Sequence, residues 1–270
     1  MNSSLTRSPV PEVLSDDELR ELHVEEQRWT HAEHVQRLHW SRERIAQERR
    51  HRLREVVSIA QEHSAWHRRR LAGVDPATLH ESAIGRLPVM TEADVMDSFD
   101  EIVTDPRLSL AGVKAHMASV ESEPRYLLGH YQTVASVGSN GQCGAFVYDW
   151  HGWTTCRAGV FRYLARDLIR PAPVGAPPMI NWWLTPEAGP IAVGCGHGSS
   201  MHVSDDLVIL EAVDENRAPV AAGVRSAKVL VTVLYNHALP LIRYELADEV
   251  TLLEGGCRCG SAHTLVHRRG

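Results

Sequence analysis

The sequence predicts an α/β protein, and three features support this prediction. Residues 15–70 contain no Gly or Pro and carry apolar residues at helical spacing, which is typical of long helices. Two β-branched runs, Val229–Tyr235 and Leu239–Tyr244, flank an Asn-His-Ala turn and predict two adjacent strands. A chain of 270 residues, 43% of them hydrophobic, can bury the core of one large or two modest domains.

Composition argues against several classes of protein. No apolar run approaches membrane-spanning length and Met1–Pro11 lacks the apolar centre of a signal peptide, so we expect a cytoplasmic protein that contacts no membrane. The net charge of −6 argues against a nucleic-acid binder. Glutamates interleave with the arginines of residues 42–70 at ion-pairing spacings, which indicates a solvated helix face.

The N-terminal third is predicted to be helical. Residues 1–14 are rich in Pro and Ser and predict a disordered lead-in. Ser15 and Glu18 are spaced as a capping box, which begins a helical region over 15–86. We expect its helices to run to about Arg70 with at most one break, because Gly73 and Pro76 follow there.

Residues 87–169 predict an α/β segment around a loop of small residues. Thr91 is placed as the N-cap of a helix. The loop Ser136–Gly141 can present backbone N–H groups to a phosphate, but it lacks a Walker ending, and by itself it favours a plain hairpin turn. Residues 150–169 predict one helix, and its expected apolar face comprises Val160, Phe161, Leu164 and Leu168.

The last third predicts a Pro-rich connector over 170–180 and a β-rich region over 181–270. Within that region, Met201–Val213 predicts a strand, and residues 214–223 a turn and a second strand. Thiolate and imidazole ligands in two short knuckles can complete a tetrahedral zinc site, although free buried thiols explain the cysteines equally well. The candidate ligands are Cys195, His202, Cys257 and Cys259, with His197 as the rival to His202.

Four stretches resemble the phenylacetate–CoA ligase-like branch of the adenylate-forming enzymes. Pro240-Leu-Ile-Arg-Tyr-Glu-Leu-Ala-Asp248 resembles its P-L-I-R-Y-x-x-x-D element. The segment from Leu87 resembles L-P-x-x-x-K-x-D/E, with Glu92 in place of the lysine. The loop from Ser136 resembles S-S-G-T-T-G-x-P, and the stretch from Asn181 resembles Y-G-x-T-E-G-G.

This resemblance implies ATP-dependent conversion of a small carboxylic acid to an acyl-adenylate (an AMP ester), then to a thioester of CoA or another thiol carrier. It also implies structural zinc near the Cys-x-Cys-Gly turn. From the residues alone, Trp183 could equally be a core aromatic, Glu187 a solvated loop charge and Asp248 the start of a turn. The implied roles are phosphate binding by Ser136, Gly138, Ser139 and Gly141, adenine contact by Trp183, Mg²⁺ binding by Glu187 and ribose binding by Asp248.

The chain also departs from the family's pattern. Val137, Asn140 and Cys143 alter the loop, and Pro186 replaces a threonine that contacts phosphate. One helix and the connector replace the family's acid-binding subdomain, and we expect the lysine-bearing C-terminal domain to be absent. The sequence therefore predicts a cut-down relative with little ligase activity. The alternative is a non-catalytic, zinc-stabilised interaction protein that forms a homo-oligomer.

Overall fold

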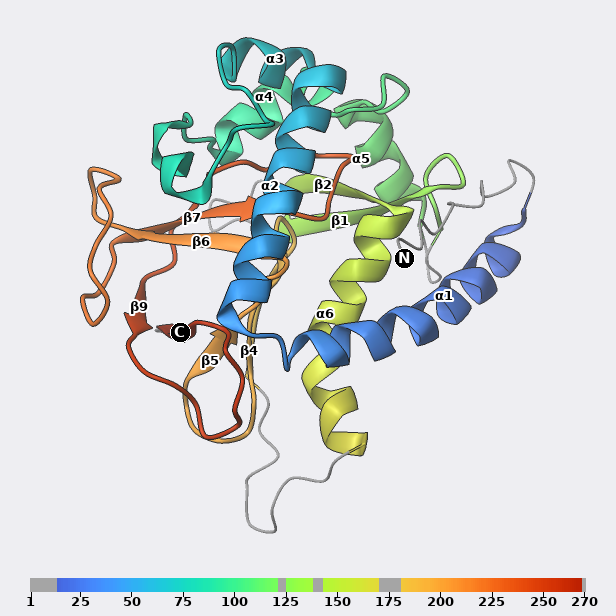
Figure 1. The fold of residues 1–270 in the computed structure, drawn as a ribbon. Coiled ribbons are helices and arrows are strands. Elements are labelled where there is room, and N and C mark those ends of the chain that lie inside the picture. Colours follow the sequence, from blue (N-terminus) through green and yellow to red (C-terminus); the bar gives the residue numbers. More distant parts are fainter. Residues whose placement is uncertain (1–13, 121–124, 138–142, 170–180, 269–270) are drawn as a thin grey trace.

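A computed structural model describes residues 14–120, 125–137, 143–169 and 181–268, and Figure 1 shows its fold. Helices and sheets are mixed, with helices dominating the N-terminal part and strands the C-terminal part, which confirms the predicted α/β class. Most of the predicted lead-in, the connector 170–180 and the loop residues Gly138, Ser139 and Gly141 lie outside the described residues.

The N-terminal region folds into more helices than predicted. The Ser15 capping box is confirmed, since the Ser15 backbone N–H donates to Glu18 Oε2 at 2.9 Å. The helical run is broken twice rather than once, because the hydroxyls of Ser41 and Ser64 each cap a new helix by accepting a backbone N–H bond. The three helices are α1 (Asp16–Arg37), α2 (Arg42–His63) and α3 (Ala65–Arg70).

Three shorter helices lead to the first strands. Thr91 is confirmed as an N-cap, and with Asp94 it forms a second capping box. This cap fixes the first residue of the following helix, Glu92, at a defined position next to the strands. The elements are the 3₁₀ helix η1 (Glu81–Arg86), α4 (Glu92–Ile102) and α5 (Leu110–Ser119).

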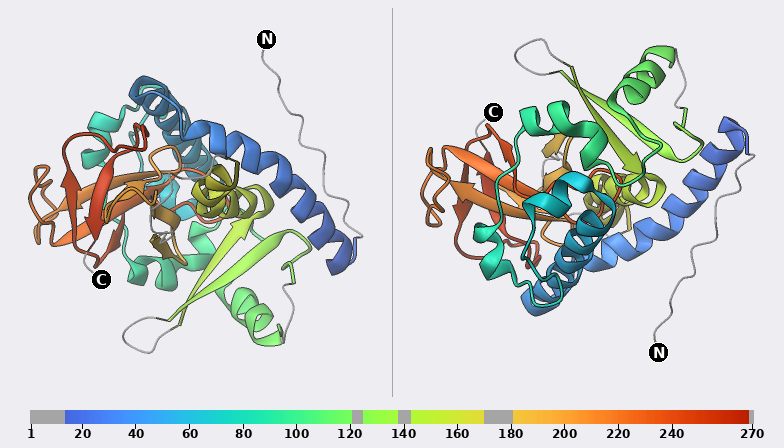
Figure 2. Two further views of the ribbon diagram at one scale, coloured as in Figure 1. Left: turned by 90° about the horizontal axis from the view of Figure 1, so that it is seen from below. Right: turned by 90° about the horizontal axis from the view of Figure 1, so that it is seen from above.

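Strands β1 (Tyr131–Val137) and β2 (Cys143–Asp149) form an antiparallel hairpin, as the loop composition favoured. Figure 2 shows the hairpin extending away from the orange and red strands, with α5 at its side. Helix α6 (Trp150–Ile169) follows directly, which confirms the predicted helix, and α1 packs along it.

The predicted apolar face of α6 is wrong. Phe161 and Leu164 are 39% and 41% exposed, whereas Ala158 and Arg162 on another face are fully buried. Arg162 can be buried because its Nη1 donates to both oxygens of the buried Asp206, at 2.7 and 2.9 Å. The buried face of α6 therefore includes a charged side chain with its ion-pair partner, on a side of the helix that the apolar pattern predicted to be exposed.

The remaining strands form two antiparallel sheets. In the larger sheet, β10 lies between β5 and β9, so it joins the two halves of the C-terminal region. The five-stranded sheet has the order β3 (Trp182–Thr185), β4 (Gly189–Gly194), β5 (Met201–Val203), β10 (Leu265–Arg268), β9 (Val250–Leu253). The three-stranded sheet has the order β6 (Val208–Val213), β7 (Lys228–Val233), β8 (Tyr244–Leu246).

Two strand predictions need correction. Residues 239–243 form a loop, and the strand that pairs with β7 begins only at Tyr244. Pro240 has no N–H with which to join a β-ladder. Leu241 and Ile242 are buried in two different apolar clusters, so the loop contributes side chains to both. The predicted strand Met201–Val213 is interrupted at residues 204–207, which separate β5 from β6, and no strand forms within 214–223.

The interior consists mainly of two apolar clusters. The larger one joins α4 and the hairpin β1–β2 to both C-terminal sheets. The smaller one packs α2 on β6 and on the loop after β7, through Leu53, Val57, Ile209 and Leu234. Among the described residues, no helix has both the length and the apolarity that crossing a membrane requires.

Candidate functional site

Three carboxylates from distant parts of the chain gather beside the hairpin. Glu92 begins α4, Glu187 lies in the turn between β3 and β4, and Asp248 lies between β8 and β9. Burial raises the pKa of the Glu187 carboxyl above its ordinary value, and the charges of Glu92 and Asp248 raise it further. Glu187 is only 9% exposed, so it is not the solvated loop charge that the alternative interpretation assumed.

The hydroxyl of Ser136 lies next to this group. Ser136 and Gly144 face one another across the hairpin. A Cβ atom on Gly144 would collide with Ser136 Oγ and would lie 3.0 Å from Phe146 Cε2 and 3.1 Å from Glu92 Oε1. The missing side chain of Gly144 therefore allows the Ser136 hydroxyl and the Glu92 carboxylate to converge. Ser136 is 7% exposed, and among the described residues its Oγ has no hydrogen-bond partner.

Arg268 links two of the predicted site residues. Its Nε donates to Asp248 Oδ1 at 2.7 Å, and its guanidinium carbon lies 5.6 Å from the centre of the Trp183 ring. Trp183 is completely buried, as the core-aromatic interpretation required, and its Nε1 has no hydrogen-bond partner within the described part of the chain. In this structure Arg268 lies over the ring that was predicted to face adenine.

Two buried tyrosines fix the turn that carries Glu187. The Tyr148 hydroxyl is 2.8 Å from the carbonyl oxygen of Pro186 and 2.9 Å from that of Glu187. The Tyr235 hydroxyl donates to the Ala188 carbonyl at 2.9 Å. Burial raises the pKa of both tyrosines well above its ordinary value, so both hydroxyls remain protonated and able to donate these bonds into the alkaline range.

The structure thus places Ser136, Glu187, Trp183 and Asp248 in one region. Arg268 is not among the predicted site residues, and Glu92 was predicted only as a departure from the family's lysine. Arg268 carries no local signal, because it reaches Asp248 through the pairing of β10 with β9. The ligand-binding roles of all these residues remain predictions.

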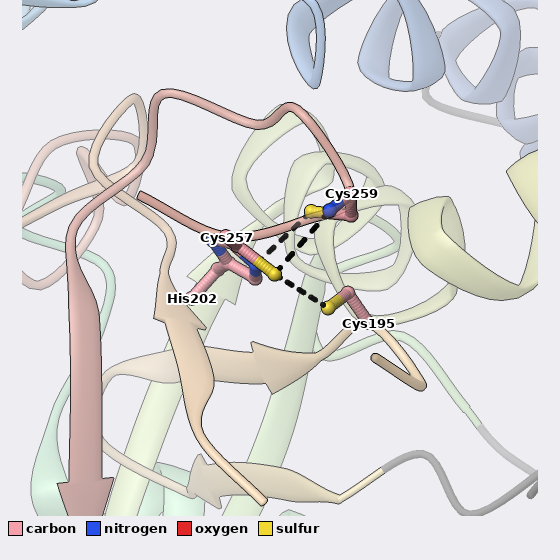
Figure 3. Close-up of side chains that lie close together, drawn as sticks. All are labelled: Cys195, His202, Cys257 and Cys259. Carbon is pink, nitrogen blue, oxygen red and sulfur yellow. Dashed lines mark hydrogen bonds between the residues drawn. The ribbon is translucent and has the colours of Figure 1, made fainter. Parts of the chain in front are cut away.

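A second cluster contains all four predicted metal ligands. The ligand atoms of Cys195, His202, Cys257 and Cys259 lie within 4.8 Å of one another, and Figure 3 shows them converging from the end of β4, from β5 and from the loop before β10. Cys195 Sγ is 3.5 Å from Cys257 Sγ, and Cys259 Sγ is 3.3 Å from His202 Nε2. Sulfur ligands of a tetrahedral zinc ion lie roughly 3.8 Å apart, so this set can hold a metal ion.

The geometry distinguishes the two histidines. His202 Nε2 points into the cluster, and its Nδ1 is 3.4 Å from the His263 carbonyl oxygen, which is the usual arrangement of a metal-binding imidazole. His197 Nδ1 instead contacts the Cys195 carbonyl oxygen at 3.1 Å. The hydrogen bond between Cys195 and Cys259 lowers the pKa of Cys259 and raises that of Cys195, so Cys259 is the thiol of this pair that ionises first.

No protein-family profile matches this chain, and no curated protein sequence does. Solved structures of 2-hydroxyisobutyryl-CoA ligase are similar to it. For an open conformation in complex with 2-HIB-AMP and CoA, the TM-score is 0.58 at 13% identity, over 84% of this chain and 74% of that chain. For the complex with 2-HIB-AMP in the postadenylation state, the TM-score is 0.59 at 14% identity, over 84% and 67%. At this identity the similarity shows a shared fold.

Proposed function

We propose that this chain is a relative of the AMP-forming acid–CoA ligases of the phenylacetate–CoA ligase-like branch. The observation that carries the proposal is that Ser136 Oγ and Glu92 Oε1 both lie beside Gly144, while the charges of Glu92 and Asp248 both act on Glu187. The motif resemblance assigns Ser136, Glu187 and Asp248 to phosphate, Mg²⁺ and ribose of one bound nucleotide. The shared fold supports it independently, since the ligase of the same fold is in complex with 2-HIB-AMP and CoA.

In the proposed site, Asp248 binds the ribose. Its Oδ1 accepts the hydrogen bond from Arg268, and no described residue donates to Oδ2. That oxygen is suited to accept hydrogen bonds from a ribose hydroxyl. Adenine would lie against Arg268, which covers the buried Trp183 ring, because a flat ring can stack on the guanidinium. Loop residues Gly138, Ser139 and Gly141 would bind the phosphates together with Ser136.

We expect this site to bind a nucleotide and turn it over slowly. Pro186 brings no hydroxyl and no N–H to the position where the family has its phosphate-binding threonine, and its carbonyl contacts Tyr148. Removing one donor that stabilises developing charge slows catalysis by about 10²–10³-fold. The small carboxylic acid and CoA or another thiol carrier are the proposed substrates.

Calorimetric titration with ATP and Mg²⁺ tests the proposal. We expect binding, and we expect Asp248→Ala to weaken it at least tenfold. Glu254→Ala is the matched control, because it removes an exposed carboxylate from the same region. Absence of ATP binding by the unaltered chain would refute the nucleotide site. Rapid acid-dependent pyrophosphate release with a panel of aryl and alkyl acids would instead refute the expected impairment.

The metal cluster supports a second candidate function. Four protein ligands complete a tetrahedral set, so we propose a structural zinc ion that holds the C-terminal sheet together. Such a site stabilises the fold without needing a nucleotide, which suits a non-catalytic interaction protein that forms a homo-oligomer. Bound zinc and a defined oligomer, found together with no affinity for ATP, would favour this candidate over the ligase.

A further inference from the structure

The cysteine–histidine cluster, formed by Cys195, His202, Cys257 and Cys259, combines one buried thiol with two thiols that solvent reaches. Cys195 is 2% exposed, whereas Cys257 and Cys259 are both partly exposed. These two cysteines lie in the loop between β9 and β10, with the exposed Arg258 between them. Because thiolates are the reactive form of cysteine, a small oxidant in solution can attack this side of the cluster.

Two of the three sulfur atoms lie close enough to form a bond after a small movement. Cys195 Sγ is 3.5 Å from Cys257 Sγ, and Figure 3 shows the two side chains pointing toward one another from separate elements. A disulfide would shorten this distance to about 2.0 Å. Cys259 Sγ also interacts with Cys195, but it contacts His202 Nε2 as well, at 3.3 Å. Among the described residues Cys257 has no other side-chain hydrogen bond, so it is the freer partner for Cys195.

The loop that carries Cys257 has room for this movement. Gly255 and Gly260, on either side of the two cysteines, have left-handed φ values of +97° and +79°. A Cβ atom placed on Gly255, Gly256 or Gly260 would meet no atom within 4 Å, so no described residue packs against these positions. The loop can therefore bring Cys257 closer to Cys195 without displacing a packed neighbour.

We propose that a hydroperoxide oxidises Cys195 and Cys257 to a disulfide and that this modification releases the zinc ion. The inference rests on the proposed zinc site and is independent of nucleotide binding. Only Cys259 and His202 would remain as ligands, and two ligands are too few for a closed tetrahedral site. The cluster is then zinc-bound when reduced and disulfide-bonded when oxidised.

The reaction balances with peroxide as the oxidant. The Cys257 thiolate attacks one peroxide oxygen, the O–O bond breaks, and the sulfur becomes a sulfenic acid while hydroxide leaves. The Cys195 thiolate then attacks this sulfur, the S–S bond forms and a second hydroxide leaves. Two electrons pass from the sulfurs to the peroxide, and two protons from solvent convert the hydroxides to water.

The test exposes the zinc-loaded full chain to hydrogen peroxide and follows zinc release with a chromogenic chelator. We expect one zinc ion released for each disulfide formed, at least tenfold faster than without peroxide, and rebinding after treatment with dithiothreitol and fresh zinc. Mass mapping of unreduced tryptic peptides identifies the pair, because cleavage after Arg258 separates Cys257 from Cys259. The buried Cys156 is the internal control and should remain a thiol.

Cys257→His is the matched variant, because it keeps four possible zinc ligands and removes the thiol that pairs with Cys195. We expect it to bind zinc and to release it at least tenfold more slowly under peroxide. Equal release from this variant would overturn the inference, and so would a disulfide between Cys195 and Cys259 or sulfinic acids in place of a disulfide. If the variant does not fold, peptide mapping of the unaltered chain decides the question.

The zinc content of the reduced chain separates this inference from the proposed zinc site. A reduced chain that binds no zinc would reject the site and, with it, the coupling of oxidation to release. A zinc-loaded chain that resists peroxide would reject only the oxidation and would leave the structural zinc site in place.

Discussion

The cysteine–histidine cluster and the carboxylate site differ in whether their side chains form a complete set of ligands. The Cys195, His202, Cys257 and Cys259 cluster supplies four ligands from two short knuckles. The charges of Glu92 and Asp248 disfavour ionisation of Glu187, and within the described part of the chain only Asp248 of these three has an ion-pair partner. A single ion would complete the first cluster, and the second has no such closed ligand set among the described residues. On this difference rests our proposal that the first is a structural centre and the second a nucleotide site.

The largest expected effect concerns the metal cluster. Cys259→Ser should lower the free energy of unfolding of the zinc-loaded chain by more than about 4 kcal/mol, because metal-binding energy is folding energy at such sites. Urea unfolding measures it. His197→Ala is the control, and it should change the stability by less than about 0.5 kcal/mol because that exposed residue lies outside the ligand set. Equal losses in both variants would contradict the assignment of His202.

Gly144→Ala tests the packing of the carboxylate site. The new Cβ would collide with Ser136 Oγ and crowd Glu92, so we expect the stability to fall by about 1–3 kcal/mol. Chemical denaturation gives the value. Gly85→Ala is the matched control, since a Cβ there meets no atom within 4 Å. A neutral Gly144→Ala would show that the hydroxyl and the carboxylate do not converge as described.

Glu187→Gln should stabilise the protein, by about 1 kcal/mol at pH 7 in buffer without divalent cations. The folded-state pKa of Glu187 is raised, so its ionisation opposes folding above the ordinary carboxyl pKa and has no effect well below it. The gain should therefore appear as the pH rises above the ordinary carboxyl pKa of about 4.3. Thermal midpoints of both proteins across this range provide the measurement, and a gain that is independent of pH would contradict the electrostatic cause.

The smallest expected effect on stability concerns Arg268. Arg268→Gln breaks a partly exposed ion pair with Asp248, so the loss should be below about 1 kcal/mol. ATP affinity should fall more, by about tenfold, because Asp248 and the Trp183 surface lose their common partner. Arg258→Gln, a change at an exposed arginine in the preceding loop, is the control. Unchanged ATP affinity in Arg268→Gln would restrict this residue to a structural role.

The sequence predicted the features that depend on near neighbours. The Ser15 capping box and the Thr91 N-cap are encoded within a few residues, and both were found where the spacing placed them. The four candidate metal ligands, which stand in two short knuckles, also lie together. The motif resemblance located Glu187 and Asp248, but their meeting with Glu92 depends on contacts between distant elements. The same limit explains the incorrect α6 face: whether Arg162 is buried is decided by Asp206, which lies on another element.

Strand β10 connects the cysteine–histidine cluster to the carboxylate site. It pairs with β5, which carries His202, and it ends with Arg268, which contacts Asp248. Loss of a zinc ion from the cysteine–histidine cluster should therefore loosen the pairing of β10 and, with it, the hydrogen bond between Arg268 and Asp248. Under the proposed function, chelation of zinc would weaken ATP binding as well as lower the stability of the fold.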